Sequence, residues 1–490
     1  MTNAPLQHQT APADGEHKTE PRAIIYALLI GAILFFAAIE MPYRPIHIPQ
    51  PALIALGLCS TLLIVFLAFE HYVIAIILLV AYLPFSGILA GDFGGFLFAF
   101  NLTNILLIVT IVGWIARGSL RGESIYSPTA MDLPLLLFCL WYTISVLRGA
   151  YGGNVDENVI ILLKRDFTPY LLFFIFANNI RTRREMEYIL VGVAFVTTVV
   201  AIMTLKEFYL DIGPRSNIEK MRVKGICQQP NELAAFFCYY APYVVAPLFS
   251  NLRARRLWGT AAAYFLCGWA LTRTISRGGT IAYTVSVLAV LWFWRRRAAI
   301  AMALAAFIVF VFFPSLVPGS IIGRFRSTWK NSPTLSTVAN PQNLEESAAG
   351  RIMIWKKSLP LILQNPIFGI GYKNYQKLMG IDAHNFYILL ATEMGIPAVL
   401  FFLYLILRLA RAAVFLQRQN TDWRVQWLAH GCLASICGVL AANFFGSRMN
   451  SQELTSLFWI LAGLVMNAAR RMQEGDPEFA SPSHGTALSQ

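Results

Sequence analysis

The polar segment from Arg222 to Asn231 has residue types that suit binding of a phosphate group. It carries two cations, Arg222 and Lys224, followed by Gly225 and a Pro-Asn turn directly before an apolar stretch. Guanidinium and ammonium groups bind phosphate oxygens through charge-assisted hydrogen bonds. The same cations could instead anchor the chain among lipid headgroups, so the residues alone leave phosphate binding and anchoring open.

A second segment, Thr274–Gly279, is a very short connection between two apolar stretches and carries Arg277 beside two glycines. Glycine lets the backbone approach a ligand closely, and a charge at membrane depth indicates a functional site by default. Arg277 is therefore a candidate for binding a charged substrate. The alternative is an arginine whose side chain extends along the apolar surface to reach water.

The third segment, Asp382–Asn385, lies ahead of Glu393 and offers a general base. A neutral imidazole accepts a hydroxyl proton near neutral pH, so His384 is the candidate base. Asp382 or Glu393 would orient its ring. In the alternative interpretation His384 is structural, while Asn385 and Glu393 cap and pack the helix that follows.

Three adjacent charges, Lys164, Arg165 and Asp166, lie near the end of another apolar stretch. Charges at such a position cost several kcal/mol on insertion scales unless they are paired or solvated. They either line a polar cavity, in which case Arg165 contacts substrate, or form an internal ion pair.

Together these features suit one reaction. Cations would hold a lipid diphosphate while a base deprotonates an acceptor hydroxyl, and the diphosphate would leave from an anomeric carbon. Electrostatic stabilisation of that leaving group would carry most of the catalysis. The donor is already activated, so we expect no nucleotide and no cofactor. The sequence has no phosphate-binding loop or dinucleotide motif, and its seven Cys and seven His lack metal-ligand spacing, so we expect no metal.

The composition places this chemistry in a membrane. Of 490 residues, 57% are hydrophobic and only 13% are charged, and the net charge is +13. That balance excludes a disordered chain, a disulfide scaffold and an ordinary soluble enzyme. A basic chain could bind nucleic acid, but a mean hydropathy of +0.57 argues against it.

A membrane helix needs about 20 apolar residues, and fourteen stretches approach that length. They are Ala23–Ile39, Ala52–Phe69, Tyr72–Leu89, Leu102–Ala116, Leu133–Leu147, Val159–Phe176, Tyr188–Met203, Leu233–Phe249, Leu257–Leu271, Thr280–Phe293, Ala298–Phe313, Ile396–Leu409, Trp427–Phe445 and Leu457–Ala468. We predict an all-α polytopic bundle of about fourteen spans, with twelve as the alternative.

The distribution of arginine sets the predicted topology. Arginines concentrate in the even-numbered connections, which the positive-inside rule places in the cytoplasm with both termini. The predicted organisation is a disordered tail over 1–22, spans one to eleven over 23–313, a large periplasmic loop over 314–395, three spans over 396–468 and a second cytoplasmic tail over 469–490. Within the large loop, Arg351–Leu363 has the spacing of an amphipathic surface helix interrupted by Pro360.

Four pieces of the sequence, in order, resemble the pattern of the O-antigen ligase / polysaccharide polymerase superfamily of bacterial inner-membrane proteins. The pieces are Arg222…Gly225…Pro230-Asn231, then Ser276-Arg277-Gly278, then Arg351…Trp355…Asn365-Pro366…Gly369-Ile-Gly371, and then His384-Asn385…Glu393-Met-Gly395. Their order, their common side and the large loop before the last spans make the set fairly specific. The resemblance covers about Lys206–Leu409.

The resemblance implies a metal-independent, inverting glycosyltransferase that takes a glycan from undecaprenyl diphosphate at the periplasmic face. Arg222 and Arg277 would bind the diphosphate, and His384 would serve as base or position the acceptor. The acceptor would be lipid A–core for a ligase, or another lipid-linked glycan for a polymerase. The full set of predicted substrate-binding residues is Lys224, Asn231, Arg351, Asn385, Glu393 and Arg165.

A secondary transporter or lipid-glycan flippase is the alternative function. It predicts inverted repeats and interrupted helices with charges at the membrane midplane. The sequence shows no two matching halves, and its unexplained charges collect on the predicted outer side. The glycan transferase is therefore the favoured hypothesis.

Overall fold

The computed structural model describes residues 72–89, 102–120, 122, 124–150, 157–212, 222–249, 254–313, 315, 346–419 and 422–479. The predicted tail over 1–22 and the first two predicted spans, Ala23–Ile39 and Ala52–Phe69, lie outside the described residues. Residues 316–345 of the predicted large loop and 480–490 of the C-terminal tail also lie outside them.

The described residues form helices joined by short connections, and no strand occurs among them, which confirms the all-α prediction. The longer helices are α3 (Tyr72–Tyr82), α5 (Leu102–Leu120), α6 (Asp132–Gly149), α7 (Glu157–Asn179), α8 (Arg183–Lys206), α9 (Pro230–Val245), α10 (Ala254–Arg273), α11 (Arg277–Trp294), α12 (Arg296–Phe312), α14 (Glu346–Gln364), α16 (Phe386–Met394), α17 (Ile396–Gln419), α18 (Trp423–Phe444) and α19 (Gln452–Gln473). The short elements are η1 (Leu83–Phe85), α4 (Ser86–Leu89), η4 (Glu207–Ile212), η6 (Gly225–Cys227), η7 (Ala246–Phe249), α15 (Asn374–Met379) and η10 (Arg448–Asn450).

Every predicted span that falls on described residues overlaps a helix. Six segments are long and apolar enough to cross a membrane by length and composition: Thr103–Leu120, Asp132–Gly149, Arg183–Leu210, Pro230–Phe249, Ile396–Gln419 and Trp423–Phe444. The chain is therefore a multi-pass membrane protein. The count of fourteen spans stays a prediction.

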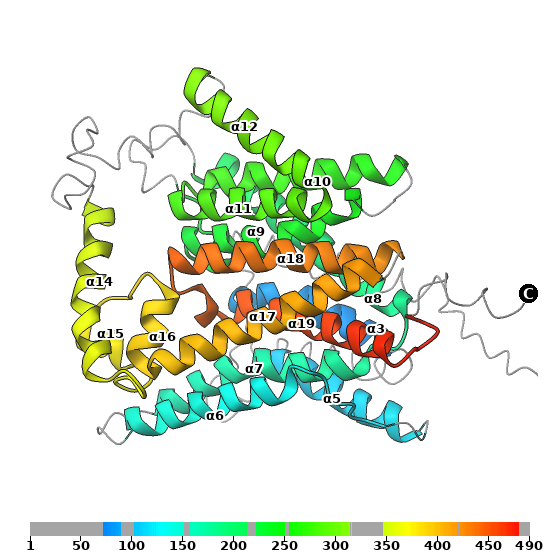
Figure 1. The fold of residues 1–490 in the computed structure, drawn as a ribbon, viewed down its shortest axis with the longest axis horizontal. Coiled ribbons are helices and arrows are strands. Elements are labelled where there is room, and N and C mark those ends of the chain that lie inside the picture. The colour runs from blue at the N-terminus through cyan, green and yellow to red at the C-terminus, as the bar shows by residue number, and fades with distance from the viewer. Residues whose placement is uncertain are drawn as a thin grey trace, which may run out of the picture.

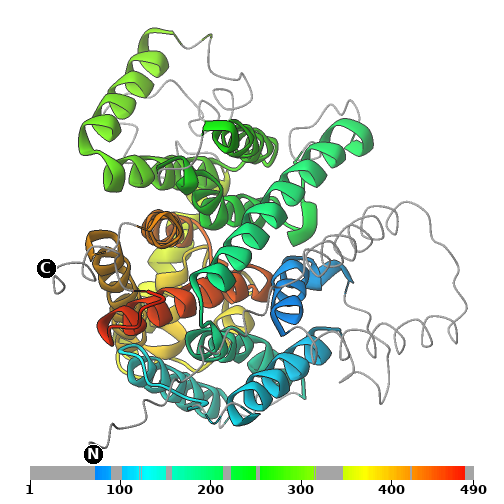
Figure 2. The same ribbon diagram turned by 90° about the vertical axis from the view of Figure 1, so that its right-hand side faces the viewer.

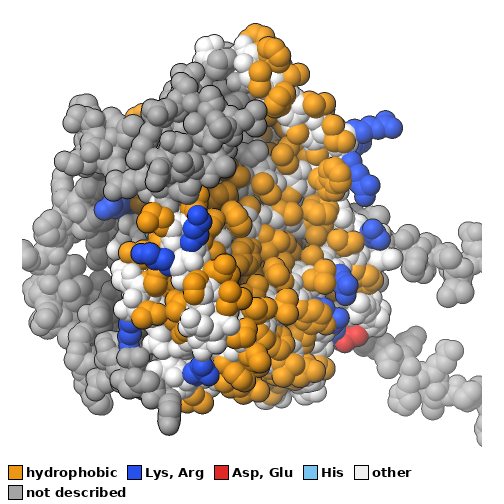
Figure 3. Space-filling model, turned by 60° about the vertical axis from the view of Figure 1, so that its left-hand side comes forward, with side chains coloured by type: hydrophobic (Ala, Val, Ile, Leu, Met, Phe, Trp, Pro, Cys, Tyr) orange, Lys and Arg blue, Asp and Glu red, His pale blue; other side chains and the backbone are white. Residues whose placement is uncertain are grey.

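The helices of the bundle run roughly side by side, and α14 lies across one end of them (Figure 1). Helix α12 projects from the bundle, and Figure 2 shows it at the margin beside α10 and α11. Most of the described α12 side chains are exposed, Phe307 by 62%. Figure 3 shows a broad hydrophobic surface on which Lys and Arg are sparse and Asp and Glu are rarer still. This outer surface suits contact with lipid.

Helix α9 lies at the centre of the bundle and is almost wholly buried, with α18 and α8 packed against it. Close approach depends on small residues, as is usual between membrane helices. A Cβ added at Gly438 of α18 would lie 2.3 Å from the carbonyl oxygen of Cys238 in α9. A buried hydrogen bond also joins the two helices, since the Trp427 indole donates to the Tyr243 carbonyl at 2.7 Å. These contacts fix the middle and the end of α9 against α18.

Ion pairs join the connections that the charge pattern assigns to one side of the membrane. Arg117, in the last turn of α5, bonds Glu185 at 2.7 Å, and Arg183 bonds Asp422 at 3.1 Å. Arg424 reaches Glu187 at 2.6 Å. The predicted cytoplasmic connections thus contact one another.

The prediction that Pro360 interrupts the amphipathic helix is wrong. Helix α14 runs from Glu346 to Gln364 with Pro360 inside it. Proline removes one backbone donor and strains the preceding turn, but packing on one face holds the helix together. Ile354 is buried against Tyr375 and Ala383, while Met353 and Leu359 on the other face are each 55% exposed. The predicted amphipathic character is therefore present.

Candidate functional site

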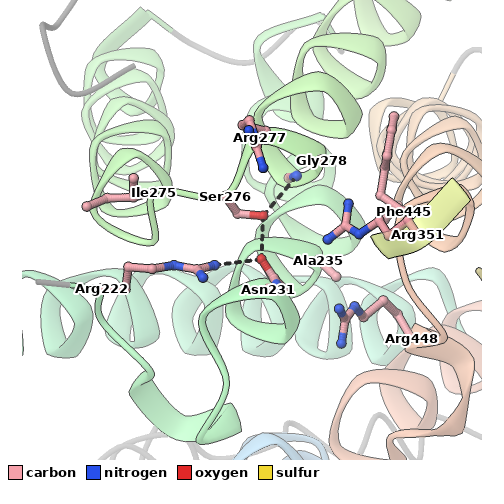
Figure 4. A pocket seen from close by; sticks show the side chains of 12 residues that line it. Arg222, Asn231, Ala235, Ile275, Ser276, Arg277, Gly278, Arg351, Phe445 and Arg448 are labelled. Atoms are coloured by element: carbon pink, nitrogen blue, oxygen red, sulfur yellow. Dashed lines mark hydrogen bonds between the residues drawn. The ribbon is translucent and has the colours of Figure 1, made fainter. Parts of the chain in front are cut away.

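One cavity at an end of the bundle brings together residues from four separate parts of the chain. It encloses about 500 Å³, including the space at its mouth. We call it the arginine pocket, and its polar lining residues are Arg222, Asn231, Ser276, Arg277, Arg351 and Arg448 (Figure 4). Four of the predicted site residues, Arg222, Asn231, Arg277 and Arg351, are therefore neighbours.

Arg222 is fixed by two hydrogen bonds that join the first two predicted segments. Its Nε donates to the Thr274 carbonyl at 3.0 Å, and its Nη2 donates to Oδ1 of Asn231 at 2.7 Å. The Ser276 hydroxyl donates to the same Asn231 oxygen at 2.8 Å. Asn231 thus holds the start of α9 against the turn before α11.

The turn before α11 is tightly built. Ile275 has a φ of 50°, which is strained for a β-branched residue. Ser276 caps α11 by accepting from the Gly279 amide at 3.2 Å. A Cβ added at Gly278 would lie 2.5 Å from Cβ of Phe445, and one added at Gly279 would lie 2.4 Å from Cβ of Ala234. The glycines therefore allow the start of α11, with its positive dipole end, to line the pocket.

Arg351 and Arg448 close the pocket from the other side. Burial lowers the pKa of Arg351, and the charges of Arg277, Arg448 and Arg222 lower it further. Arg448 is only 6% exposed, and its Nη1 lies 3.4 Å from Oε1 of Glu232. Its backbone amide donates to Asn443 at 3.0 Å, which fixes the turn after α18.

The electrostatics of the pocket favour a multiply charged anion. Four guanidinium groups line it, and Glu232 pairs with that of Arg448. The N-terminal ends of α9 and α11 add the partial positive charge of their unpaired amides. A diphosphate offers oxygens in several directions and would engage several of these donors together.

His384 lies next to the arginine pocket, in the loop between α15 and α16. Its Nδ1 is 3.3 Å from Oδ2 of Asp382, and its backbone amide donates to the same oxygen at 3.0 Å. Burial lowers the pKa of His384, the Asp382 carboxylate raises it, and the Arg351 and Arg448 charges lower it. The net shift is downwards, so the imidazole is neutral at neutral pH and can accept a proton.

The backbone of His384 is left-handed, with a φ of 51°. Among residues other than glycine, His, Asn and Asp enter this region most readily. The bond from the His384 amide to Asp382 stabilises the turn. The side chain is 40% exposed, so it remains accessible.

Asn385 is engaged within the protein at both ends of its amide. Its Oδ1 accepts from the Ile388 amide at 3.1 Å and caps α16, while its Nδ2 donates to the Phe444 carbonyl at 3.1 Å. The side chain is 2% exposed. These contacts match the alternative in which Asn385 caps the helix and places the neighbouring His384.

Glu393 is buried at the end of α16, away from the arginine pocket. Its Oε1 accepts from the Tyr375 amide at 3.2 Å. Burial raises the pKa of Glu393 to about 7, against the opposing effect of the Lys373 charge. Gly369 of the Gly369-Ile-Gly371 piece makes room here, because a Cβ at Gly369 would lie 2.3 Å from the Glu393 carbonyl carbon. Glu393 lines a second cavity instead.

Lys224 and Arg165 lie outside the arginine pocket. The Lys224 side chain is exposed, and its backbone amide donates to Glu207 at 3.1 Å, which anchors the loop to η4. Arg165 lines a third, smaller cavity together with Asp166. The polar-cavity interpretation of the Lys164–Asp166 charges therefore fits the structure.

Arg448 is the site residue that the sequence patterns missed. It was interpreted only as one of the few charges in short outer connections. The sequence pattern that could have identified Arg448 is the one that identified Arg277, namely an arginine in a very short outer turn near a glycine. Among the described residues, no group of three His, Cys, Asp or Glu side chains could hold a metal ion.

Comparisons with known proteins give a family match over part of the chain and a distant likeness to solved structures. Residues 262–403, less than a third of the chain, match the family model of the O-antigen ligase. This segment contains Arg277, Arg351 and His384. A comparison with curated proteins found no match. One chain from a solved peptidoglycan synthase complex has a TM-score of 0.39 and 17% identity, and the match covers 70% of this chain and 98% of that chain. That likeness is too distant to transfer a fold or a function.

The family match falls on three of the four sequence pieces that resemble the superfamily, and the structure gathers the fourth, around Arg222, into the same pocket. The match of residues 262–403 to the O-antigen ligase family supports the resemblance of the chain to the O-antigen ligase / polysaccharide polymerase superfamily.

Proposed function

We propose that the protein transfers a glycan from undecaprenyl diphosphate to an acceptor hydroxyl at the periplasmic face of the inner membrane. The observation that carries the proposal is the arginine pocket, in which four guanidinium groups and two helix N-termini face one cavity. The acceptor is lipid A–core for a ligase, or another lipid-linked glycan for a polymerase of O-antigen or exopolysaccharide units.

The family match supports glycan transfer by a membrane enzyme as the general activity in this proposal. Members of the family are glycosyltransferase-like membrane enzymes that use lipid-linked glycans. The family and the apolar helices together indicate a multi-pass protein of the bacterial inner membrane. The donor, the side of the membrane and the mechanism are our inferences from the pocket.

In the proposed mechanism the arginine pocket holds the diphosphate and stabilises it as it leaves. Arg222 and Arg277 bind its oxygens, with Arg351 and Arg448 opposite them. The electron pair of the breaking bond between the anomeric carbon and oxygen moves onto the diphosphate. Charge therefore grows on a group that is already surrounded by fixed donors, which is where electrostatic catalysis is most effective.

His384 is the proposed base. The acceptor oxygen attacks the anomeric carbon from the face opposite the diphosphate, and its proton moves to the neutral imidazole. Asp382, 3.3 Å from Nδ1, orients the ring and stabilises the imidazolium that forms. One displacement of this kind inverts the anomeric configuration. The step balances without a metal ion or a cofactor.

The test uses purified protein in liposomes with undecaprenyl-diphosphate-linked glycan extracted from the producing strain. His384→Asn suits the left-handed backbone of this position but lacks the base, and should lower transfer by roughly 10²–10⁴-fold. Near-normal transfer by this variant would remove His384 from the mechanism. Wild-type protein that moves the lipid across the bilayer without transferring glycan would overturn the proposal in favour of a flippase.

Deletion of the gene separates ligase from polymerase. Loss of the O-chain ladder from lipopolysaccharide, with lipid-linked polymer still present, identifies a ligase. Loss of exopolysaccharide with an unchanged ladder identifies a polymerase of that polymer.

A further inference from the structure

A second cavity lies close to the arginine pocket and has the opposite chemistry. It spans about 440 Å³, including the open space at its mouth. Five aromatic side chains and two carboxylates line it together with apolar residues, and we call it the tyrosine cavity. These seven residues are Phe138, Tyr142, Asp166, Tyr170, Tyr372, Phe386 and Glu393.

Asp166 is held in place by two tyrosine hydroxyls. Tyr372 donates to its Oδ2 at 2.6 Å, and Tyr142 donates to the same oxygen. The two tyrosine rings lie with centroids 5.2 Å apart. Within the described ranges, no hydrogen bond occupies Oδ1 of Asp166. The carboxylate is therefore oriented by the protein, with one oxygen left to accept from a ligand.

The short element η10 connects the linings of the two cavities. Arg448 lines the arginine pocket, and the next two residues of η10, Met449 and Asn450, line the tyrosine cavity. On another side, Phe386 of the tyrosine cavity is two residues from His384. A molecule whose diphosphate occupies the first cavity would bring its adjoining group towards the second.

The third cavity continues this space. It encloses about 210 Å³ and shares Asp166, Tyr170, Met449 and Asn450 with the tyrosine cavity. Arg165 and Gln452 add polar groups to its wall. The polar space therefore extends past a single ring-sized site.

The charges of the two cavities indicate different ligands. The guanidinium groups attract phosphate, whereas Asp166 and Glu393 would repel it. A carboxylate oxygen accepts hydrogen bonds from hydroxyl groups. The faces of a pyranose ring carry C–H groups that pack on aromatic rings, and its rim carries hydroxyls. A sugar ring fits both features of the tyrosine cavity.

We propose that the tyrosine cavity is a sugar subsite, in which Asp166 accepts a hydrogen bond from a hydroxyl of a pyranose ring of the glycan. The ring belongs either to the donor, next to the diphosphate, or to the acceptor. This proposal rests on the proposed transferase function. Tyr142 and Tyr372 are positioning residues that act through Asp166 and supply the apolar wall.

Binding measurements on the full-length protein in nanodiscs test the subsite separately from transfer. The probes are undecaprenyl diphosphate without sugar, the same lipid carrying the glycan of the producing strain, and lipopolysaccharide that lacks O-chain. Asp166→Asn keeps the shape of the side chain but loses its charge. We expect it to weaken binding of a glycan-bearing probe by about ten-fold or more, with binding of the sugar-free lipid unchanged.

Tyr375→Phe is the matched control. It removes a buried tyrosine hydroxyl that bonds Ser358 at 2.8 Å and does not line the tyrosine cavity. It should change none of the three affinities. Tyr372→Phe keeps the ring but frees Asp166 from one donor, and should weaken the same probe as Asp166→Asn. Melting temperatures of all variants exclude a loss of fold.

The outcomes are distinct. If Asp166→Asn weakens binding of the glycan-bearing lipid alone, the sugar ring in the subsite belongs to the donor. If it weakens binding of lipopolysaccharide, or raises the acceptor KM while donor affinity is unchanged, the ring belongs to the acceptor. Unchanged glycan affinities and unchanged KM values for both substrates in Asp166→Asn overturn the subsite. Failure of wild-type protein to bind the sugar-free lipid diphosphate overturns the proposed function instead.

Discussion

The guanidinium of Arg222 donates to the side-chain oxygen of Asn231 at 2.7 Å, and that oxygen also accepts from Ser276. One neutral amide therefore supports a cation of the arginine pocket without neutralising it. A carboxylate at the same place would make equally good hydrogen bonds but would compete with a bound anion. The choice of Asn over Asp is thus informative about the ligand.

Asn231→Asp should leave the fold intact and weaken donor binding. The new carboxylate keeps both acceptor contacts, but it pairs with Arg222 and repels a diphosphate. We expect the donor KM to rise about ten-fold or more, the scale of one charge-assisted bond, with an unchanged melting temperature. Gln229→Asp adds the same charge at an exposed position that makes no side-chain cap, and should have a much smaller effect. Equal KM values for the two variants would contradict the role of the pocket.

Arg448 and Glu232 offer a test that separates stability from binding. Arg448→Gln leaves Glu232 without its 3.4 Å partner, which should cost on the order of 2 kcal/mol because both groups are largely buried. Adding Glu232→Gln removes the unpaired charge and should restore the melting temperature. Donor affinity should stay low in the double variant. If affinity returned together with stability, Arg448 would be structural only.

The pH profile of transfer reports on His384. The Asp382 carboxylate raises the pKa of His384, and the Arg351 charge lowers it. A general base is active when deprotonated, so the acidic limb of kcat/KM follows this pKa. Asp382→Asn should therefore move the limb to lower pH, and Arg351→Gln should move it to higher pH. Shifts in the same direction, or none, would show that another group controls the limb.

Gly278→Ala tests the contact between α11 and the end of α18. The added Cβ would lie 2.5 Å from Cβ of Phe445, which cannot rotate away. Overpacking of this kind costs about 1–3 kcal/mol, and it would displace the start of α11 from the pocket. We expect a lower melting temperature and a raised donor KM. Gly259→Ala in α10 has open space around its Cβ and should be neutral or stabilising.

Glu393 should make stability depend on pH. Burial raises its pKa in the folded protein from 4.5 to about 7, so its favourable contribution is complete below about 4.5 and is lost as pH rises through 7. The difference in melting temperature between Glu393→Gln and wild type should therefore grow in favour of the variant from pH 5 to pH 8. A difference that is constant with pH would contradict this.

The sequence predicted the helices well because the membrane demands continuous apolar stretches, and every predicted span on described residues overlaps a helix. The sequence also singled out Arg222, Arg277 and Arg351, which share one cavity, while their role as a site stays a prediction. Each of these arginines was singled out because it is a cation in a predicted outer segment that the positive-inside rule does not explain. Helix α14 was misjudged at Pro360 because the stabilising contacts come from Tyr375 and Ala383, which no local pattern reveals.

Other features could not be predicted because they depend on contacts between distant segments. The tyrosine cavity joins α6, α7 and the segment before α15, and its centre is the pair of bonds to Asp166. Arg448 enters the site only because α18 ends beside α11. Conversely, Lys224 and Asn385 were predicted to contact substrate, but the first side chain lies outside the arginine pocket and the second is occupied as a helix cap.

The hydrogen bond from the Trp355 indole to the Ala383 carbonyl, at 3.0 Å, ties α14 to the loop that carries His384. Arg351 lies one turn before Trp355 on the same helix. In the proposed mechanism, this contact would couple the arginine that binds the leaving diphosphate to the histidine that accepts the proton, because α14 holds both. A tilt of α14 would therefore displace Arg351 and His384 together.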